Sequence, residues 1–225
     1  MTRDIDDVAR TARALASTFE VSEITIVGSQ AILVHRADAM VALRNSPEID
    51  AFVRIPGGAG PMGEEASHVI NTNFGEGSAF HKEHGFFIDG VDESTAKLPP
   101  DWRSRAIERD VPDSSGGTVR IVAPAVADLV ASKLVRGERK DISFAALCIA
   151  SGLTNGKAVR ASIMAAIPGD PKHALTCLKD ATSNQAEHVA AAKRGPLPTK
   201  GPRNPLDDLD AVDAIKRMLD DRKSR

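Results

Sequence analysis

The chain has 225 residues, with 29 Lys and Arg against 31 Asp and Glu and a formal net charge of −2. This charge balance excludes a histone-like protein that wraps nucleic acid, but it permits a local basic patch. The chain has seven Phe, one Trp and no Tyr, which are too few aromatic residues for an extended surface that stacks the bases of single-stranded nucleic acid. Because the N-terminus MTRDIDDVAR is charged and no apolar run reaches the roughly 18–20 residues of a membrane span, we expect a cytoplasmic protein with no secretory signal and no membrane association.

The first half of the chain alternates amphipathic stretches with short β-branched ones. Apolar residues at spacings of three and four predict a helix over residues 4–19. Strands are predicted at 23–27, 48–55, 86–91, 105–111 and 118–122. Helices are expected between them at 30–35 and 64–73, with a loop and a helix over 75–85. The glycine-rich stretch at 57–60 lacks the ending of a phosphate-binding loop, so we interpret it as a flexible loop.

The pattern changes after Pro124, where helical stretches rich in Ala, Leu and Ile replace the strands. Helices are predicted at 125–135, 139–150, 158–166 and 173–194. Four Pro and two Gly within 195–205 predict a linker, and a last amphipathic helix follows within 206–225. We therefore expect an α/β core over 1–123, a helical region packed on it over 124–194, a linker over 195–205 and a C-terminal helix over 206–225. The predicted fold class is α+β, a small mixed sheet with flanking helices followed by a helical C-terminal half.

Two acidic residues and a glycine turn carry the clearest chemical signal. Glu48 and Asp50 share one face of a predicted strand, because alternate side chains of a strand point the same way. Paired carboxylates of this kind suit Mg²⁺, which binds one or two carboxylates together with substrate phosphates. Gly28–Ser29, between a strand and a predicted helix, offers backbone N–H groups, a hydroxyl and a helix N-terminus for a phosphate. Together these parts favour phosphoryl or nucleotidyl transfer.

The same residues resemble a known signature. IVGSQAI followed by SPEIDAFV is similar to the polymerase-β-like nucleotidyltransferase superfamily, whose pattern is an apolar residue, Gly and Gly or Ser, then two acidic residues flanking an apolar one. Roughly residues 24–150 resemble a bacterial family of nucleotidyltransferase-like proteins, and the resemblance includes GEGSAFHKEHGFFIDGV, TAKLPPDWRSR and ADLVASKLVRGERKDISF. This family is related to the AbiEii-type toxins of toxin–antitoxin and phage-defence systems. The resemblance implies a small mixed nucleotidyltransferase-type sheet that carries metal carboxylates, with a helical partner region.

The resemblance also assigns roles to individual residues. It implies that Gly28 and Ser29 grip phosphate and that Glu48 and Asp50 are the first two ligands of Mg²⁺ or Mn²⁺. The third carboxylate is expected on a neighbouring strand, where Asp89 in FFIDGV is the best match and Asp92 the alternative. Two departures bear on activity: the first ligand is Glu instead of the commoner Asp, and the gap from Ser29 to Glu48 is longer than is usual in the superfamily.

Basic residues after the last predicted strand are candidates for holding a triphosphate. Lys133 lies on one predicted helix with Asp128, and Lys140 opens the next. By resemblance we expect Lys133 and Lys140 to bind the nucleoside triphosphate, while the alternative is that Lys140 and Asp141 form a charge pair on the surface at the start of a helix. For His81 and His84, three residues apart without a third ligand, we expect a structural or substrate-contact role instead of a zinc site.

The leading hypothesis is a metal-dependent nucleotidyltransferase that moves a nucleoside monophosphate from a nucleoside triphosphate to an acceptor hydroxyl. The acceptor would be tRNA or a protein side chain, and the protein would act in a toxin–antitoxin or defence system with a cognate partner. The first alternative is a catalytically silent protein of the same fold that acts as a binding module or antitoxin, which the two departures favour. A third hypothesis is a nucleotidyltransferase that modifies a small molecule such as an antibiotic.

Overall fold

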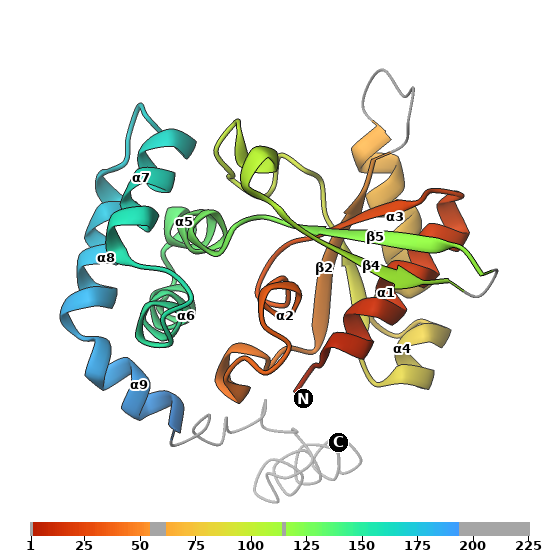
Figure 1. Ribbon diagram of the computed structural model, residues 1–225, viewed down its shortest axis with the longest axis horizontal. Coiled ribbons are helices and arrows are strands. Elements are labelled where there is room, and N and C mark those ends of the chain that lie inside the picture. The colour runs from red at the N-terminus through yellow and green to blue at the C-terminus, as the bar shows by residue number, and fades with distance from the viewer. Residues whose placement is uncertain (1, 55–61, 114–115, 194–225) are drawn as a thin grey trace, which may run out of the picture. The chain divides into compact units, whose positions relative to one another are not determined.

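The computed structural model describes residues 2–54, 62–113 and 116–193 (Figure 1). The chain up to Lys193 forms one compact unit. The predicted flexible loop at 57–60, the linker at 195–205 and the helix at 206–225 lie outside the described residues. In the part of the chain that the structure describes, no helix is long and apolar enough to span a membrane.

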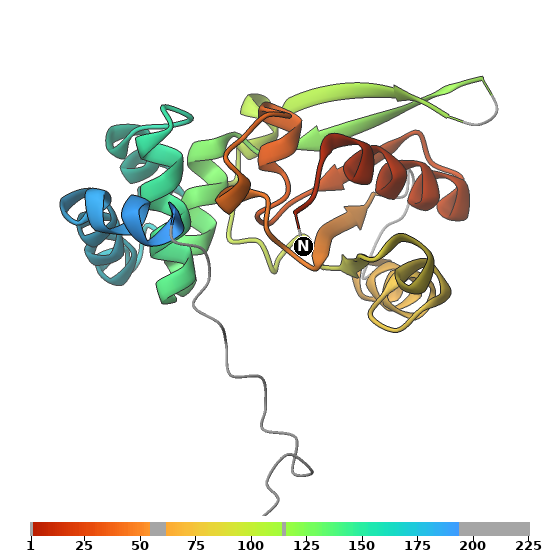
Figure 2. The same cartoon turned by 90° about the horizontal axis from the view of Figure 1, so that it is seen from below.

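Five strands form a single mixed sheet. In chain order they are β1 (Glu23–Ile26), β2 (Glu48–Val53), β3 (Phe87–Gly90), β4 (Ile107–Pro112) and β5 (Thr118–Ala123). Their order across the sheet is β3-β2-β1-β5-β4. The pairs β1–β2 and β4–β5 are antiparallel. The pairs β1–β5 and β2–β3 are parallel. The β4–β5 hairpin forms one edge of the sheet (Figure 2). The predicted mixed sheet with flanking helices is confirmed.

One face of the sheet is covered by α1 (Ile5–Phe19) and α3 (Met62–Phe74) (Figure 1). α1 begins at a capping box formed by Asp4 and Asp7, which satisfies backbone N–H groups that a helix start otherwise leaves unpaired. Ile49 and Ile88, both 0% exposed, belong to the large core cluster that also contains residues of these helices. Because side chains alternate along a strand, the residues between them face the other side, which is where the candidate site lies.

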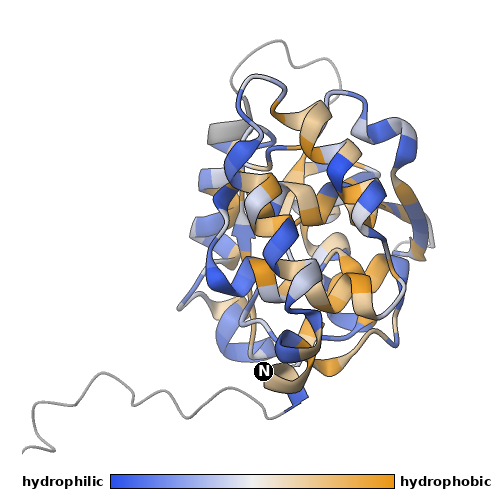
Figure 3. Ribbon diagram, turned by 90° about the vertical axis from the view of Figure 1, so that its left-hand side faces the viewer, coloured by the Kyte–Doolittle hydropathy of each residue, from blue (hydrophilic) through white to orange (hydrophobic). Residues whose placement is uncertain are grey.

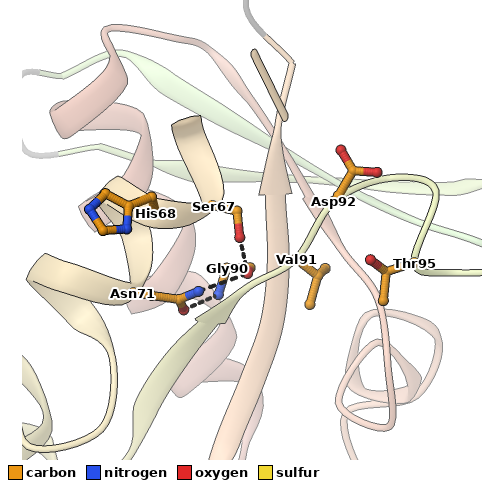
Figure 4. A pocket seen from close by; sticks show the side chains of 7 residues that line it. All are labelled: Ser67, His68, Asn71, Gly90, Val91, Asp92 and Thr95. Atoms are coloured by element: carbon orange, nitrogen blue, oxygen red, sulfur yellow. Dashed lines mark hydrogen bonds between the residues drawn. The ribbon is translucent and has the colours of Figure 1, made fainter. Parts of the chain in front are cut away.

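The edge strand β3 is held by side chains of α3. Asn71 donates from Nδ2 to the carbonyl of Gly90 at 3.0 Å and accepts the Gly90 N–H at 2.7 Å, and the Ser67 hydroxyl donates to the same carbonyl (Figure 4). The amide of Asn71 thus pairs with the backbone of β3 as a further strand would, which protects part of an otherwise open sheet edge.

The second half of the described chain is helical, as predicted. The helices are α5 (Val126–Arg136), α6 (Arg139–Ala150), α7 (Gly156–Ala166), α8 (Lys172–Ser183) and α9 (Gln185–Lys193). Figure 3 shows this helical side, on which hydrophilic and hydrophobic stretches alternate along the helices, as expected for helices with one buried face. Both cysteines are free and buried, Cys148 on α6 and Cys177 on α8.

Several predicted boundaries differ from the structure by one or two residues, and two differences have a clear physical reason. The single helix expected over 173–194 is two helices that meet at Asn184. The side chain of Asn184 bonds to the Asp180 carboxylate in α8, and its carbonyl accepts the N–H groups of Glu187 and His188 at the start of α9. Short polar side chains such as Asn bond to local groups and interrupt helices in this way. The strand expected from residue 105 begins at Ile107, since Trp102–Arg105 form a 3₁₀ turn in which Trp102 is buried against Phe52.

A short helix between β1 and β2 is hydrogen-bonded to the start of the helical half. α2 (Ile32–His35) has only four residues and buries Ile32, Leu33 and Val34. His35 Nε2 donates to the carbonyl of Pro124 at 2.8 Å, at the junction between β5 and α5. This bond fixes the start of α5 relative to the segment that follows β1.

Candidate functional site

Three carboxylates lie on the sheet face opposite α1 and α3. In the parallel pairing of β2 with β3, Asp50 is the register partner of Asp89, and Glu48 is the partner of Phe87. Neighbouring strands are about 4.8 Å apart, so Asp50 and Asp89 are direct neighbours. Glu48, Asp50 and Asp89 are half-buried, while the residues between them along each strand are fully buried.

The alternative third carboxylate is placed differently. Asp92 lies beyond the end of β3, where its Oδ1 accepts the Ser94 N–H at 2.7 Å. It lines a pocket with Ser67, Asn71 and Thr95 beside the sheet edge, and neither Asp50 nor Asp89 lines that pocket (Figure 4). The structure therefore brings Asp89, and not Asp92, beside Asp50.

Burial, with repulsion between the carboxylates as a second cause for Glu48 and Asp50, raises the pKa values of these side chains. Burial raises the pKa of Asp50 to about 6, and the charges of Glu48 and Asp89 add to the increase while Lys133 opposes it. The pKa of Glu48 is raised by burial and then by Asp89, and burial raises the pKa of Asp89. Each carboxylate pays a free-energy penalty for its charge here, which a bound cation would remove.

The three carboxylates suit a divalent cation whose remaining ligands are water or substrate oxygens. Within residues 2–54, 62–113 and 116–193, no three His, Cys, Asp or Glu side chains are grouped so as to hold a metal ion by themselves. Mg²⁺ usually keeps several waters and binds one or two carboxylates plus substrate phosphates. Asp50 and Asp89, with Glu48 beside them, meet that requirement only when phosphate or water oxygens complete the set.

Gly28 lies in direct contact with the carboxylate of Asp50. Its φ is +63°, and a Cβ added there would be 1.7 Å from Asp50 Oδ2. The preceding residue, Val27, donates its N–H to the Asp50 carbonyl at 2.9 Å. The turn after β1 is therefore pressed against β2, and only glycine permits this approach.

Ser29 is oriented by a buried neighbour that the sequence interpretation did not select. Gln30 is 0% exposed and donates from Nε2 to Ser29 Oγ at 3.2 Å. Because Ser29 Oγ accepts this bond, its own O–H is left to donate to a ligand. The sequence indicates such a role for Gln30, because this polar residue stands between Ser29 and the apolar AILV stretch. The expected helix N-terminus contributes little, since α2 is only four residues long and starts at Ile32.

Lys133 is the cation with the largest effect on the pKa of Asp50. Its side chain is 18% exposed, and its Nζ lies 4.0 Å from Asp141 Oδ1 and 5.1 Å from the centre of the Phe144 ring. Burial lowers the pKa of Lys133, whereas Asp50 and Asp141 raise it. The positive charge of Lys133 in turn lowers the pKa of Asp50 and of Glu48.

Asp141 anchors the cations on this side of the site. It is 1% exposed and binds Arg136 through two bonds, Nε to Oδ2 at 2.8 Å and Nη2 to Oδ1 at 2.7 Å. The expectation of a surface charge pair between Lys140 and Asp141 is therefore wrong. Lys140 is 70% exposed and lies 3.1 Å from Glu138, while its charge lowers the pKa of Glu48. The Asp141 carboxylate also accepts the N–H of Glu138 at the start of α6.

Asp128 does not belong to this group of charges, although it shares a helix with Lys133. It is 0% exposed, and its carboxylate accepts bonds from Arg105 Nη2 at 3.1 and 3.2 Å and from the Ser162 hydroxyl at 2.7 Å. Arg105 precedes β4 and Ser162 lies on α7, so Asp128 joins three elements of the fold. We assign it a structural role.

His81 and His84 both lie on α4 (Ala79–His84), at the outer side of β3. His81 Nδ1 accepts the Gly77 N–H at 2.9 Å, and its ring lies 5.3 Å from the ring of Phe87. His84 packs against Phe80 at 4.5 Å between ring centres. Both rings pack against aromatic neighbours, in line with the structural or substrate-contact role expected from the sequence.

One family matches the chain. A protein-family model described as "Nucleotidyltransferase of unknown function (DUF6036)" matches residues 3–147. The matched segment includes the whole sheet, the turn at Gly28–Ser29, the three carboxylates, and both Lys133 and Lys140. No curated protein and no solved structure matches the chain.

Proposed function

The chain belongs to this family of nucleotidyltransferases of unknown function, and on that premise we propose that it is a metal-dependent enzyme that moves a nucleoside monophosphate from a nucleoside triphosphate to an acceptor hydroxyl. The observation that carries the proposal is the register of β2 with β3, which sets Asp50 beside Asp89 on the face that also presents Glu48. Gly28 contacts the Asp50 carboxylate, and Lys133 compensates its charge.

Glu48, Asp50 and Asp89 are the proposed ligands of Mg²⁺ or Mn²⁺. The chemistry supplied by the bound metal is neutralisation of charge on the attacking and leaving oxygens of an in-line displacement at the α-phosphate, with pyrophosphate as the leaving group. The raised pKa values of all three carboxylates support this assignment, because burial makes their negative charges unfavourable despite Lys133, and a divalent cation would stabilise them. Asp89, on the edge strand, is the proposed base that accepts a proton from the acceptor hydroxyl.

The proposed triphosphate site lies between the turn after β1 and the ends of α5 and α6. The Ser29 hydroxyl and the backbone N–H groups of Gly28 and Ser29 would donate to phosphate oxygens. Lys133 would supply a partly buried charge near the metal, and exposed Lys140 a second charge at the mouth of the site. Gln30 and Asp141 would act indirectly, by orienting Ser29 and by holding Lys133 and Arg136.

The proposed acceptor is a macromolecule, tRNA or a protein side chain. Over roughly residues 24–150 the sequence resembles a bacterial nucleotidyltransferase-like family that is related to AbiEii-type toxins, and this supports a place in a toxin–antitoxin or defence system with a cognate partner. In that setting the protein would act in the cytoplasm, where nucleoside triphosphates and tRNA are found.

The competing proposal is a catalytically silent protein of the same fold. Two observations favour it: no three ligand side chains within the described residues are grouped to hold a metal by themselves, and Glu stands at the first ligand position. Such a protein would bind a nucleotide or a partner protein without turnover.

A labelling experiment separates the two proposals. Purified protein would be incubated with Mg²⁺ or Mn²⁺, each of the four α-³²P-labelled nucleoside triphosphates, and either bulk tRNA or a cell lysate. Label on RNA or on a protein band, with release of pyrophosphate, would support the enzyme. If nothing is labelled with any nucleotide or metal, while the protein binds a nucleotide or a partner tightly, the silent protein is the correct reading.

Lys140→Ala should weaken binding of a nucleoside triphosphate by about three- to tenfold, the range expected for one solvent-exposed charge–phosphate contact. The midpoint of thermal unfolding should stay unchanged, because the side chain is 70% exposed and its ion pair with Glu138 lies on the surface. Isothermal titration with a nonhydrolysable triphosphate would measure the affinity. Lys172→Ala, which removes an exposed lysine from α8, is the matched control. Equal affinities for the two variants would remove Lys140 from the site.

A further inference from the structure

An aromatic side chain lies among the carboxylates of the proposed site. Phe87 alternates with Ile88 along β3, so it shares its face with Asp89, and it is the register partner of Glu48 on β2. Phe87 is half-buried, whereas Phe86 and Ile88, which face the core, are 0% exposed. A partly exposed ring between two acidic residues has an apolar face that no core cluster of the described residues covers.

His81 holds the ring of Phe87 from the outer side. The two rings meet edge to face, with 5.3 Å between centres and an interplanar angle of 62°. His81 cannot turn freely, because its Nδ1 accepts the Gly77 N–H at 2.9 Å. Its helix is fixed by Phe80, which contacts both Phe74 and Phe86 edge to face. Phe87 and His81, here called the aromatic pair, thus form a preorganised surface.

The strand order sets the sequence in which the site residues follow one another from the inside of the sheet to its edge. From the inside of the sheet to its edge, the face presents the turn at Gly28–Ser29 after β1, then Asp50 on β2, then Asp89 and Phe87 on β3. Lys133 is the cation with the largest effect on the central Asp50, Lys140 is the one with the largest effect on Glu48, and neither is among the charges that shift the pKa of Asp89 at the edge. The Gly28–Ser29 turn therefore lies toward the inside of the sheet and Phe87 lies at its edge, with Asp50 on the strand between them.

We propose that Phe87 and His81 form a subsite that stacks a single nucleobase next to the carboxylates. This inference rests on the proposed function and adds the orientation of its substrate, with phosphates toward Ser29 and Lys133 and a base toward β3. The base belongs either to the nucleoside triphosphate or to the nucleotide of an RNA acceptor that is attacked through its hydroxyl. Stacking on one ring is compatible with the low aromatic content of the chain, because one base needs only one platform.

Ligands with and without a base provide the test. Affinities in Mn²⁺ would be measured for the four nucleoside triphosphates, for ribose 5-triphosphate and for inorganic tripolyphosphate. A second arm would compare a short single-stranded RNA with the same RNA made abasic at its 3′ nucleotide. Base–aromatic stacking predicts that wild type prefers the base-containing member of one arm by about tenfold or more. The arm that shows this preference identifies the source of the base.

Phe87→Leu should abolish that preference while leaving tripolyphosphate binding within twofold of wild type, because Leu keeps an apolar side chain but lacks a ring face. Phe87→Tyr should retain the preference. Phe74→Leu is the matched control, since it removes a ring from the same aromatic cluster but on α3, away from the carboxylate face. Thermal unfolding would confirm that all variants fold.

The outcomes separate this inference from the proposed function. The subsite is overturned if wild type binds tripolyphosphate as tightly as a nucleoside triphosphate and binds abasic RNA as tightly as intact RNA. The triphosphate site would stand in that case. This comparison uses wild type alone, so it is valid even if Phe87→Leu fails to fold. If base preference survives in Phe87→Leu, the subsite is also overturned. If no triphosphate binds but RNA shows a preference that depends on Phe87, the subsite is supported and the proposed reaction fails. If wild type binds none of these ligands, both fail.

Discussion

Asp50→Asn should abolish nucleotide transfer, with a loss of at least about a thousandfold, and leave the fold intact. The amide keeps the volume of the side chain but removes the negative charge proposed to hold the metal. The position is sensitive because Asp50 is the central carboxylate of the three: it is the register partner of Asp89, lies on the strand of Glu48 and contacts the turn at Gly28. The labelling assay with tRNA or lysate measures the effect.

The same substitution should not lower stability at neutral pH. The pKa of Asp50 is raised from 3.8 to about 6, so the folded protein binds this proton more tightly than the unfolded chain does. The charged carboxylate therefore costs stability above pH 6, by an upper limit of roughly 3 kcal/mol, and this cost disappears as the pH falls below about 4. Lys133 loses part of its compensation in the variant, so we expect a net gain of about 1 kcal/mol at pH 8. Urea unfolding at pH 8 and pH 5 should show that the gain shrinks at the lower pH.

Asp92→Asn is the matched control for this prediction. Asp92 is another acidic residue close to β3, but it lies beyond the strand and bonds to the Ser94 N–H. This variant should transfer nucleotide at the wild-type rate. Wild-type activity in Asp50→Asn would show that the site is wrong even if the class of enzyme is right, and loss of activity in Asp92→Asn would point to Asp92 as a ligand in place of Asp89.

The common face of Glu48 and Asp50 could be predicted from the sequence because alternation along a strand is a local property. The position of Asp89 beside Asp50 could not be derived in this way. It depends on the order of the strands and on a register in which a shift by one residue would turn Asp89 to the opposite face. The sequence resemblance selected Asp89 over Asp92, and the pairing of β2 with β3 now supports that choice.

Buried polar residues in and around the site were the hardest to predict from the sequence. Asp141 and Asp128 resemble ordinary surface charges of helices in the sequence, yet they are 1% and 0% exposed because Arg136 and Arg105 reach them from other positions. The Arg105–Asp128 pair forms only when separate elements pack, and the Arg136–Asp141 pair depends on the turn between α5 and α6, so no periodicity indicates either of them. Gln30 is different, since a polar residue next to an apolar stretch and directly after Gly28–Ser29 was visible in the sequence.

Gly28→Ala should lower the free energy of unfolding by about 2–4 kcal/mol and abolish transfer in the fraction that folds. Two effects add. A side chain at a φ of +63° costs about 1 kcal/mol, and the new Cβ would lie 1.7 Å from Asp50 Oδ2, so that the carboxylate or the turn must move. Gly152→Ala separates the effects, because Gly152 has a φ of +70° and nothing within 4 Å of the added Cβ. That control should lose only about 1 kcal/mol.

A double-mutant cycle then tests whether Asp50 is the cause. In an Asp50→Ala background the carboxylate is gone, and Gly28→Ala should cost little more than Gly152→Ala costs in wild type. The expected coupling between the two positions is about 1–3 kcal/mol, measured by urea unfolding at pH 8. If Gly28→Ala is equally destabilising with and without the Asp50 carboxylate, then the turn after β1 is not pressed against that side chain. In that case the glycine would reflect backbone conformation alone, and the proposed contact between the phosphate-binding turn and the metal carboxylate would be lost.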